Sequence, residues 1–525
     1  MTDSTKKVLL VQPRTLDFFW SCPEINKMVG LKATIIPLGL ITVAALLPKE
    51  WNLRLVDLNV RPLTEDDWTW AEMIMLSGMI VHRKGLLAVA GEARSRGKTV
   101  VVGGPYVSSV SDEELKDNYD YAVEGEAESS LPLFLEALGK GIRPGKIAGE
   151  RHPSLNSSPI PRFELLDLEA YGDMAVQTTR GCPFDCEFCN VVSLFGRRIR
   201  HKPIDQVIKE LEVINDLGWR GEIFIVDDNF IGDKEYARAF LEKLTSWSKT
   251  RGEPFSFITQ ATVNLGQDKA LIDLMTAANF GSVFLGIESP DEEVLKQTHK
   301  LHNLTHPMNQ SIFNVMTNGL NVIGSFIIGF DHEKPGTDER ICRLVDSTGI
   351  PLVMINLLAP LPNTRLWRRL KDENRLLFDS DFNESVRIKL NYRPARSEKE
   401  TIAELLKTID YLYAPEHYLE RVRKFCLTIR PTRRAQAKAQ GQKPARTPLA
   451  RPPLRRRLKD LRALSIIIWR QGIRAPIRRL FWRNLIIVLS KNPSRIKLYF
   501  RLTGHGEDLF KIRADTIREY QVLNQ

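Results

Sequence analysis

Six short apolar runs alternate with amphipathic stretches through the middle of the chain, and this alternation limits the possible folds more than any other feature. Each run is rich in β-branched or aromatic residues and has the length of a buried strand, whereas the stretches between them have helical spacing. Such a series predicts parallel strands joined by helices, in the form of a partial (β/α)6 barrel whose reactive residues lie where the strands end. The runs lie around Ala175–Thr178, Ile223–Val226, Phe255–Thr259, Val283–Ile287, Val322–Ile328 and Leu352–Asn356.

A similar alternation precedes the barrel and predicts a Rossmann-like α/β domain in the first 150 residues. Ligands of such sheets bind at the carboxyl ends of the strands, where two glycine-containing loops are expected, one at Ser77 and one at Gly103 and Gly104. Glycines there let the backbone approach a flat ligand or a phosphate, although plain turn glycines remain the alternative. The expected strands and helices are Val8–Val11, Leu53–Val56, Met73–Leu76, Val100–Val102, Leu38–Leu47 and Leu86–Arg96.

Length and composition fit a folded protein of several domains. With 525 residues, of which 43% are hydrophobic and 26% charged, the chain is neither collagen-like nor mainly disordered. A segment rich in Pro and Ser at 151–165 predicts a linker between the first domain, 1–150, and the barrel, 166–395. Residues 396–525 are expected to form a mainly helical and basic C-terminal region, with a loop or disordered stretch at 430–457.

Three cysteines stand within eight positions directly after the first predicted barrel strand, at Cys182, Cys186 and Cys189. Three thiolates this close can hold one face of a metal centre, and the lack of a fourth nearby Cys or His argues against a closed zinc site. A four-iron cluster held by three cysteines would keep one iron free for a ligand. Unrelated buried cysteines or a zinc loop are the less favoured alternatives, and the scattered Cys22, Cys342 and Cys426 are expected to be small buried residues.

The C-x3-C-x2-C loop, with Phe188 before its last cysteine, resembles the signature of radical S-adenosylmethionine enzymes. The resemblance implies that Cys182, Cys186 and Cys189 ligate a [4Fe-4S] cluster, whose free iron binds the amino and carboxylate groups of S-adenosylmethionine. Electron transfer then cleaves the sulfonium and yields a 5′-deoxyadenosyl radical. In this family the residue at the position of Phe188 packs near the adenine.

Residues at other strand ends match further positions of the same family. Asp227 and Asp228 stand where members bind the methionine amino group, and Glu288 stands where polar side chains meet the ribose or the methionine. Gly329 closes the fifth strand signal, where the backbone lies against adenine. Carboxylates suit a site that holds a sulfonium and an ammonium. Taken singly, each residue could instead be a salt-bridge partner at the barrel rim or a helix cap.

The N-terminal domain resembles the cobalamin-binding domain that precedes many radical S-adenosylmethionine proteins, on stretches that include Ser77, GGPYVS at 103–108 and VEGEAES at 123–129. The resemblance implies that Ser77, Gly103 and Gly104 line the lower face and nucleotide tail of the corrinoid. The loop that supplies a lower histidine in corrinoid methyltransferases is altered after Asp17, and His82 is expected to start a helix instead. Cobalamin would then lack a protein histidine, or would be absent from a domain that serves as a scaffold.

The resemblance covers nearly the whole chain, with hopanoid methylases among the characterised relatives. It implies cobalamin-dependent C-methylation of an unactivated carbon in a lipid or other hydrophobic metabolite, with electrons from a reductant such as flavodoxin or ferredoxin. One S-adenosylmethionine would methylate cob(I)alamin and a second would supply the radical. The alternative is a radical enzyme of another outcome, such as cyclisation, rearrangement or RNA modification, whose N-terminal domain uses no cobalamin. A binding protein without turnover is disfavoured by the intact cysteine loop.

The charge of the chain is divided. Residues 421–525 hold 27 Lys and Arg against 5 Asp and Glu, whereas the whole chain holds 75 and 64, so residues 1–420 are acidic. Within the tail, arginines alternate with Trp, Ile and Leu over 464–489, and Pro476 is expected to separate two helices. Such helices can lie on an anionic membrane or pack on the barrel, while nucleic-acid binding is the least favoured reading.

The start of the chain has too short an apolar run for a secretory signal, and no stretch reaches the roughly 18 apolar residues of a membrane span. A cytoplasmic protein is therefore expected, with peripheral contact at the inner membrane face as the role of the tail.

Overall fold

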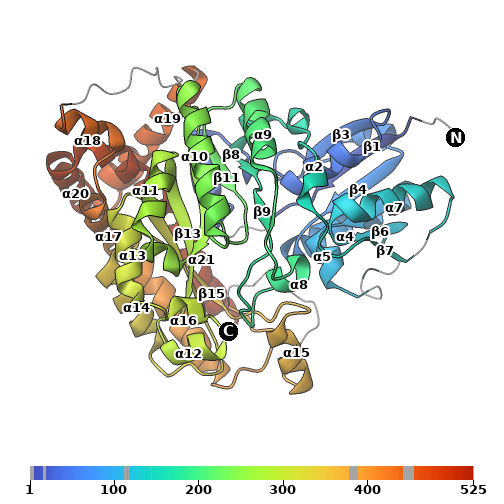
Figure 1. Cartoon of the computed structure of the whole chain (residues 1–525). Helices are drawn as coiled ribbons and strands as arrows, with labels where there is room; N and C mark the ends of the chain where they lie inside the picture. The colour runs from blue at the N-terminus through green and yellow to red at the C-terminus, as the bar shows by residue number, and fades with distance from the viewer. Residues whose placement is uncertain are drawn as a thin grey trace.

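The computed structural model (Figure 1) describes residues 5–15, 19–111, 115, 118–143, 145–377, 388–441 and 454–523. Asp17 and the stretch 442–453 of the expected loop lie outside these ranges. Two parallel sheets lie side by side, and helices of the last part of the chain pack against the end of the second sheet. The predicted α/β class, the partial barrel and the helical C-terminal region are all confirmed.

The first sheet has six parallel strands in the order β3-β1-β4-β5-β6-β7. Four of them coincide with predicted strands, and the short β6 and β7 extend the sheet beyond them. Helices α2 (Leu38–Leu46), α4 (Arg83–Ser95) and α7 (Ala127–Gly139) surround this sheet. The strands are β1 (Lys7–Gln12), β3 (Asn52–Asp57), β4 (Met73–Ser77), β5 (Thr99–Gly103), β6 (Tyr121–Glu124) and β7 (Lys146–Ala148).

The second sheet is the curled half-barrel, with the order β15-β14-β13-β12-β11-β8-β2. Six of its strands are the predicted ones. The seventh, β2, comes from the first 150 residues and pairs in parallel with β8, Ala33 opposite Tyr171, so that part of the chain contributes to both sheets. The strands are β2 (Ala33–Ile35), β8 (Tyr171–Val176), β11 (Glu222–Ile225), β12 (Ser256–Thr262), β13 (Phe280–Glu288), β14 (Asn321–Ile328) and β15 (Leu352–Leu357).

Alternation along the strands divides the side chains between two faces of the barrel sheet. On β11, Ile223 and Ile225 are fully buried, as expected for side chains that meet the surrounding helices. Phe224 points the other way and stacks on Trp20, which also contacts Phe284 of β13 at a centroid distance of 5.1 Å. The covering helices are α9 (Ile204–Asp216), α10 (Lys234–Thr250), α11 (Lys269–Ala277), α12 (Glu292–Gln297), α13 (Met308–Thr317) and α14 (Thr337–Thr348).

The C-terminal region is helical and packs through a buried apolar core. Tyr418, Phe425, Phe481 and Leu502 are fully buried there, so the helices are not merely appended. Pro476 lies between the π-helix η7 (Ile468–Arg474) and α20 (Arg478–Lys491) and separates two helices, as predicted. Part of the expected loop is helix, in α18 and the start of α19. The other helices are α15 (Arg365–Asp372), α16 (Glu398–Leu412), α17 (Pro415–Thr428), α18 (Arg433–Ala439), α19 (Leu454–Ile467), α20 (Arg478–Lys491) and α21 (Ile496–Leu523).

Among the residues that the structure describes, no helix is both long and apolar enough to cross a bilayer.

Candidate functional site

The cysteine loop begins where β8 ends and places Cys182, Cys186 and Cys189 together, half-buried and outside any disulfide. Gly181 opens the loop at φ +96°, and a Cβ there would stand 2.7 Å from the carbonyl oxygen of Arg198, so only glycine fits. Burial raises the thiol pKa of all three cysteines, that of Cys189 to about 12. A bound cation would displace these protons, and three thiolates on one loop suit an iron–sulfur cluster.

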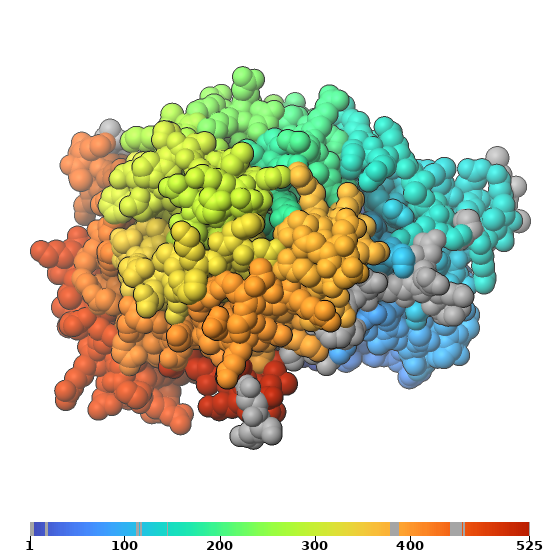
Figure 2. Space-filling view, turned by 90° about the horizontal axis from the view of Figure 1, so that it is seen from below, coloured from blue at the N-terminus to red at the C-terminus, as the bar shows by residue number. Residues whose placement is uncertain are grey.

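Two residues between the cysteines are held by the helix α15. Arg365 forms an ion pair with Asp185 at 2.6 Å, and Arg369 forms one with Glu187 at 2.6 Å. The backbone N–H of Leu366 donates to the carbonyl oxygen of Glu187 at 2.9 Å. Figure 2 shows the gold segment that contains α15 between the yellow and orange part of the molecule and the blue N-terminal part. The loop is therefore positioned by a segment far from it in sequence.

Asp227 holds the end of β8 in place. Its two carboxylate oxygens accept hydrogen bonds from the backbone N–H groups of Thr178 and Thr179, at 2.7 and 3.0 Å, and from both threonine hydroxyls. The side chain is fully buried. Asp227 accepts four hydrogen bonds within the protein and so orients the residues that lead into the cysteine loop, and it forms neither an ion pair nor a helix cap with the described residues.

The two residues that follow Asp227 are placed differently from it. Asp228 accepts one hydrogen bond, from the N–H of Gly181 at 3.0 Å, and burial raises the pKa of its carboxyl to about 6. Asn229 is 2% exposed, and its amide has no nitrogen or oxygen partner among the described residues but approaches the Cys182 thiol, where it favours the thiolate. A buried amide without a nitrogen or oxygen partner is rare in folded proteins and indicates a missing ligand. Asp228 and Asn229 are thus the groups near the end of β11 that can form further hydrogen bonds with a ligand.

Glu288 lies beside a lysine that the sequence analysis missed. Its Oε1 accepts a hydrogen bond from Lys300 Nζ at 2.8 Å, and both side chains are buried. Glu288 adopts φ +66°, and a Cβ on Gly286 would stand 2.6 Å from its Oε1, so the strand end is shaped around this pair. Lys300 Nζ also lies 5.8 Å from the ring centroid of Phe188, beside the cysteine loop. The GIE motif could have suggested a buried carboxylate, but nothing local points to a lysine twelve residues away.

Gly329 and Phe188 lie at the same end of the barrel. Gly329 adopts φ +114°, its N–H donates to Glu333 at 2.8 Å, and its carbonyl oxygen accepts a hydrogen bond from the Tyr392 hydroxyl. The backbone of Gly329 is therefore engaged within the protein. Phe188 packs against Phe330, the next residue, with ring centroids 5.5 Å apart.

In the first domain, the structure brings Ser77, Gly103 and Gly104 together at the ends of β4 and β5. Gly104 adopts φ +89°, and a Cβ there would stand 2.4 Å from Ser77 Oγ. His82 ends the short 3-10 helix η1 (Ile80–His82) and stands directly before α4, at the helix start that the sequence predicts. Its Nδ1 accepts a hydrogen bond from the N–H of Met79 at 3.0 Å, which leaves Nε2 to donate to Thr15 Oγ1 at 3.0 Å. Both ring nitrogens are occupied, so His82 is not poised to bind a metal.

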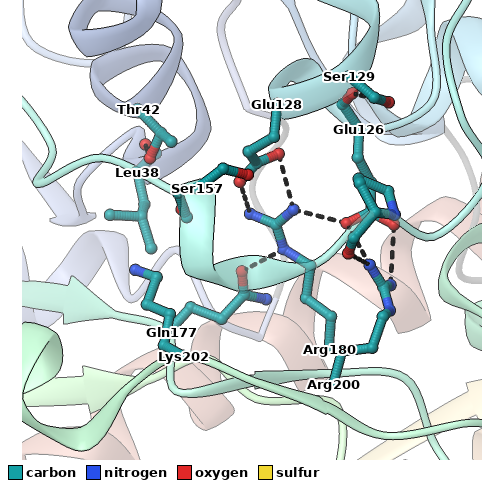
Figure 3. A network of polar contacts seen from close by, with 12 residues as sticks. Leu38, Thr42, Glu126, Glu128, Ser129, Ser157, Gln177, Arg180, Arg200 and Lys202 are labelled. Carbon is teal, nitrogen blue, oxygen red and sulfur yellow. Dashed lines mark hydrogen bonds and ion pairs between the residues drawn. The ribbon is translucent and has the colours of Figure 1, made fainter.

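A buried ion-pair network joins the two domains beside these loops (Figure 3). Arg180, directly before the cysteine loop, binds Glu128 at 2.8 Å and Glu126 at 2.7 Å. Arg200, its partner on the neighbouring strand of a two-stranded ribbon, binds Glu126 at 2.8 Å. Burial raises the pKa of Glu128, but the charge and hydrogen bonds of Arg180 outweigh burial and leave that pKa below its usual value. The predicted VEGEAES stretch therefore reaches the barrel through its glutamates.

A second contact between the domains lies near α15. The side-chain amide of Asn363, after β15, donates to the carbonyl oxygen of Ser109 at 3.0 Å. The loops after β8 and β15 thus both touch segments that follow β5 and β6. These contacts place the edge that carries Ser77 and Gly104 next to the end of the barrel that carries the cysteines.

Comparison with known proteins agrees with the family that the cysteine loop resembles. Residues 176–345 match the radical SAM superfamily, and residues 364–522 match a domain of unknown function, DUF4070. A protein of Synechocystis described as an uncharacterized methyltransferase is 41% identical over 97% of this chain and 92% of its own length. The hopanoid C-2 methylase of Rhodopseudomonas palustris is 32% identical over 91% of this chain and 89% of its own.

Two solved structures share the fold. The cobalamin-dependent S-adenosylmethionine radical enzyme OxsB, with aqua-cobalamin bound, superimposes with a TM-score of 0.60 at 15% identity, over 99% of this chain and 82% of its own. The radical S-adenosylmethionine methyltransferase TsrM from Kitasatospora setae gives 0.58 at 17% identity, over 70% and 76%. The family match of residues 176–345 and the 32% identity to the hopanoid C-2 methylase, together with the cysteine loop at the end of the first barrel strand, show that the chain belongs to the radical S-adenosylmethionine superfamily.

Proposed function

We propose that the protein is a cobalamin-dependent radical S-adenosylmethionine methyltransferase that acts on a carbon of a hydrophobic small molecule. The observation that carries the proposal is the contact between the domains. The Arg180 pairs and the bond from Asn363 to Ser109 join the start of the cysteine loop and the loop after β15 to the segments after β6 and β5, the edge that also carries Ser77 and Gly104, so we expect the ligands of the two domains to lie close together. The names of the relatives in Synechocystis and Rhodopseudomonas support the reaction class.

When bound, the cluster with S-adenosylmethionine supplies a 5′-deoxyadenosyl radical, and cobalamin supplies the methyl group. Cys182, Cys186 and Cys189 would hold the cluster. The Asn229 amide and the Asp228 carboxylate suit the amino group of S-adenosylmethionine, and Lys300, paired with Glu288, suits its carboxylate. These assignments place the methionine end between the strand ends of β11 and β13.

The loops of the first domain suit a flat corrinoid. Gly104 brings the backbone within contact distance of Ser77 and Gly78, and its lack of a side chain suits the close approach of a planar ligand to this edge. Because both nitrogens of His82 are engaged by Met79 and Thr15, we expect cobalamin to bind without this histidine as a ligand to cobalt.

A hydrophobic substrate is inferred from the name of one relative, and the aromatic side chains inside the barrel agree with it. Trp20 lies against Phe224 and Phe284, with ring centroids 6.0 and 5.1 Å away. The relative in Rhodopseudomonas is named for a hopanoid, a polycyclic lipid. A small-molecule substrate and an external reductant, such as flavodoxin or ferredoxin, agree with the reaction class.

The basic tail offers a surface for an anionic membrane at the inner face. Trp469 and Ile473 of η7 are 58% and 51% exposed, and Arg474, Arg478 and Arg479 stand exposed beside them. Each basic group near an anionic bilayer contributes on the order of 1 kcal/mol to binding. A protein that collects its substrate from lipid would use such a contact.

The experiment that tests this function uses the full chain, reconstituted with iron, sulfide and hydroxocobalamin under anaerobic conditions. With a reductant, S-adenosylmethionine labelled in its methyl group and a hopanoid acceptor, we expect 5′-deoxyadenosine and a labelled acceptor. Formation of 5′-deoxyadenosine without bound cobalamin or a labelled product would instead support a cyclisation or rearrangement. Nucleic acid is not expected to accept the label.

A further inference from the structure

Three metal-binding side chains from the two ends of the chain meet far from the cysteine loop. Cys22 directly precedes α1 (Pro23–Val29), whereas His505 and Asp508 lie on α21. One donor atom of each, the thiol sulfur, a ring nitrogen and a carboxylate oxygen, lies within 4.8 Å of the others. No function described above uses these residues.

The cluster lies at the opposite end of the barrel from the cysteines. One turn before His505 on α21, Arg501 reaches Glu222 at 3.1 Å, and Glu222 is the first residue of β11. Cys182, Cys186 and Cys189 follow the carboxyl ends of the strands, whereas Glu222 marks an amino end. Cys22 and the three cysteines of the loop therefore cannot ligate the same metal centre.

The helix α21 is shaped to bring His505 close to α1. Glycines flank His505 inside this 28-residue helix, at positions where glycine is unfavourable. A Cβ on Gly504 would lie 3.4 Å from Ile25 of α1, and one on Gly506 would lie 2.8 Å from Tyr418 of α17. The sequence thus gives up helix propensity for close contact on both sides of the histidine.

His505 and Asp508 each have a free coordination position, and the Cys22 thiol donates its proton to the Phe19 carbonyl oxygen at 3.5 Å, a proton that a metal ion would replace. His505 makes no hydrogen bond with any described residue, and one of its ring nitrogens lies within 4.8 Å of the Cys22 sulfur and of an Asp508 oxygen. The carboxylate of Asp508 accepts the N–H groups of Glu24 at 2.7 Å and Ile25 at 3.3 Å, one on each oxygen, which leaves a further lone pair on both. Cys22 adopts φ +43°, a left-handed conformation that non-glycine residues rarely take.

We propose that Cys22, His505 and Asp508 bind a Zn²⁺ ion, with a solvent molecule as the fourth ligand, and that this ion joins α1 to α21. A thiolate, an imidazole and a carboxylate form a donor set that Zn²⁺ accepts and that Ca²⁺ and Mg²⁺ do not. Binding releases the thiol proton to solvent, and the two anionic donors balance the charge of the ion. Capping of α1 by Asp508 alone would explain neither the unpartnered His505 nor the strained Cys22.

The test measures zinc in the full-length protein after loading with ZnCl₂ and gel filtration. We expect about one zinc per chain, which is retained when Cys182, Cys186 and Cys189 are all replaced by alanine. The variants Cys22→Ser and His505→Gln should each lose zinc at least ~10-fold, whereas Cys342→Ser, a half-buried cysteine elsewhere, should keep it. Asp508 is left unchanged because it also caps α1.

A second measurement remains decisive if the variants fold poorly. In the triple-alanine protein, which lacks the cluster ligands and is purified without added corrinoid, Co²⁺ should give a thiolate-to-cobalt charge-transfer band, and zinc should raise the thermal unfolding midpoint. The proposal is overturned if zinc stays below about a tenth of an equivalent. It is also overturned if zinc is unaffected in both Cys22→Ser and His505→Gln, or if the cobalt band is absent.

Discussion

Arg180 Nη2 lies 2.8 Å from Glu128 Oε1 in a buried ion pair that connects the start of the cysteine loop to α7 of the first domain. Arg180 stands two residues before Cys182, and Glu128 stands in the first turn of α7. The pair therefore links the position of the cluster to the position of whatever the first domain binds.

Replacement of Glu128 by glutamine should lower methyl transfer more than it lowers the formation of 5′-deoxyadenosine. The variant leaves Arg180 underpaired in a buried site and loosens the contact between the domains. A displacement of about 1 Å between reacting groups can lower a rate ~100-fold, so we expect methyl transfer to fall at least ~10-fold. Formation of 5′-deoxyadenosine depends on the barrel alone and should stay within ~3-fold of the wild type.

Glu136→Gln is the matched control, because Glu136 lies on the same helix and pairs with Lys140 in solvent. It should leave both products unchanged, since exposed ion pairs contribute little. Equal loss of both products in Glu128→Gln, or loss of neither, would contradict a role for the ion pair in joining the domains.

Lys300 is predicted to act on S-adenosylmethionine rather than on the cluster. Lys300→Met removes the charge beside Glu288 and should lower 5′-deoxyadenosine formation at least ~10-fold while the iron content stays the same. The control is Lys296→Met, which removes an exposed lysine four residues earlier. If Lys300→Met loses iron in proportion to activity, the lysine supports the cysteine loop instead.

The stability of the first domain should fall in mild acid because of His82. Burial lowers the pKa of His82 from 6.5 to about 4, so the unfolded chain takes up a proton first as the pH falls. The contribution of neutral His82 is present above pH 6.5 and is lost as the pH falls toward 4, by about 3 kcal/mol in total. Urea unfolding near pH 7.5 and 5.5 should show a steeper loss for the wild type than for His82→Gln. Parallel losses would show that His82 does not titrate in this range.

If the tail contacts the membrane, removal of its exposed apolar side chains should reduce binding to liposomes. Trp469→Ser together with Ile473→Ser should reduce flotation with phosphatidylglycerol liposomes several-fold, because both side chains are exposed among arginines. Ile142→Ser, which alters an equally exposed residue of the first domain, should have no effect. Recovery that is the same for all three proteins would indicate that the tail serves only to pack against the barrel.

The barrel could be predicted because its strands are continuous apolar runs, as at Ile223–Val226, whose first three residues lie in β11. The strand β2 could not be predicted, since Ala33–Ile35 is too short for a periodic signal and gains its stability from pairing with β8. Within a motif, sequence also does not reveal partners. Asp227 and Asp228 are neighbours, yet one is satisfied by Thr178 and Thr179 while the other accepts a single bond.

The other features that could not be predicted from the sequence depend on contacts between distant segments. The cysteines were recognisable from their spacing, but Arg180 and Glu128 are 52 residues apart and belong to different domains. Their pairing depends on how the two sheets dock, which no local pattern encodes. The same holds for Lys300, which reaches Glu288 only because the chain turns back after α12.

The most direct test of the central assignment is 5′-deoxyadenosine formation by the anaerobically reconstituted full chain with reductant and S-adenosylmethionine. The assignment predicts that the wild type forms this product and that Cys182→Ala, which removes one of three thiolates, forms none above background. Absence of 5′-deoxyadenosine from wild-type protein with a complete cluster, or equal amounts from Cys182→Ala, would contradict the radical chemistry.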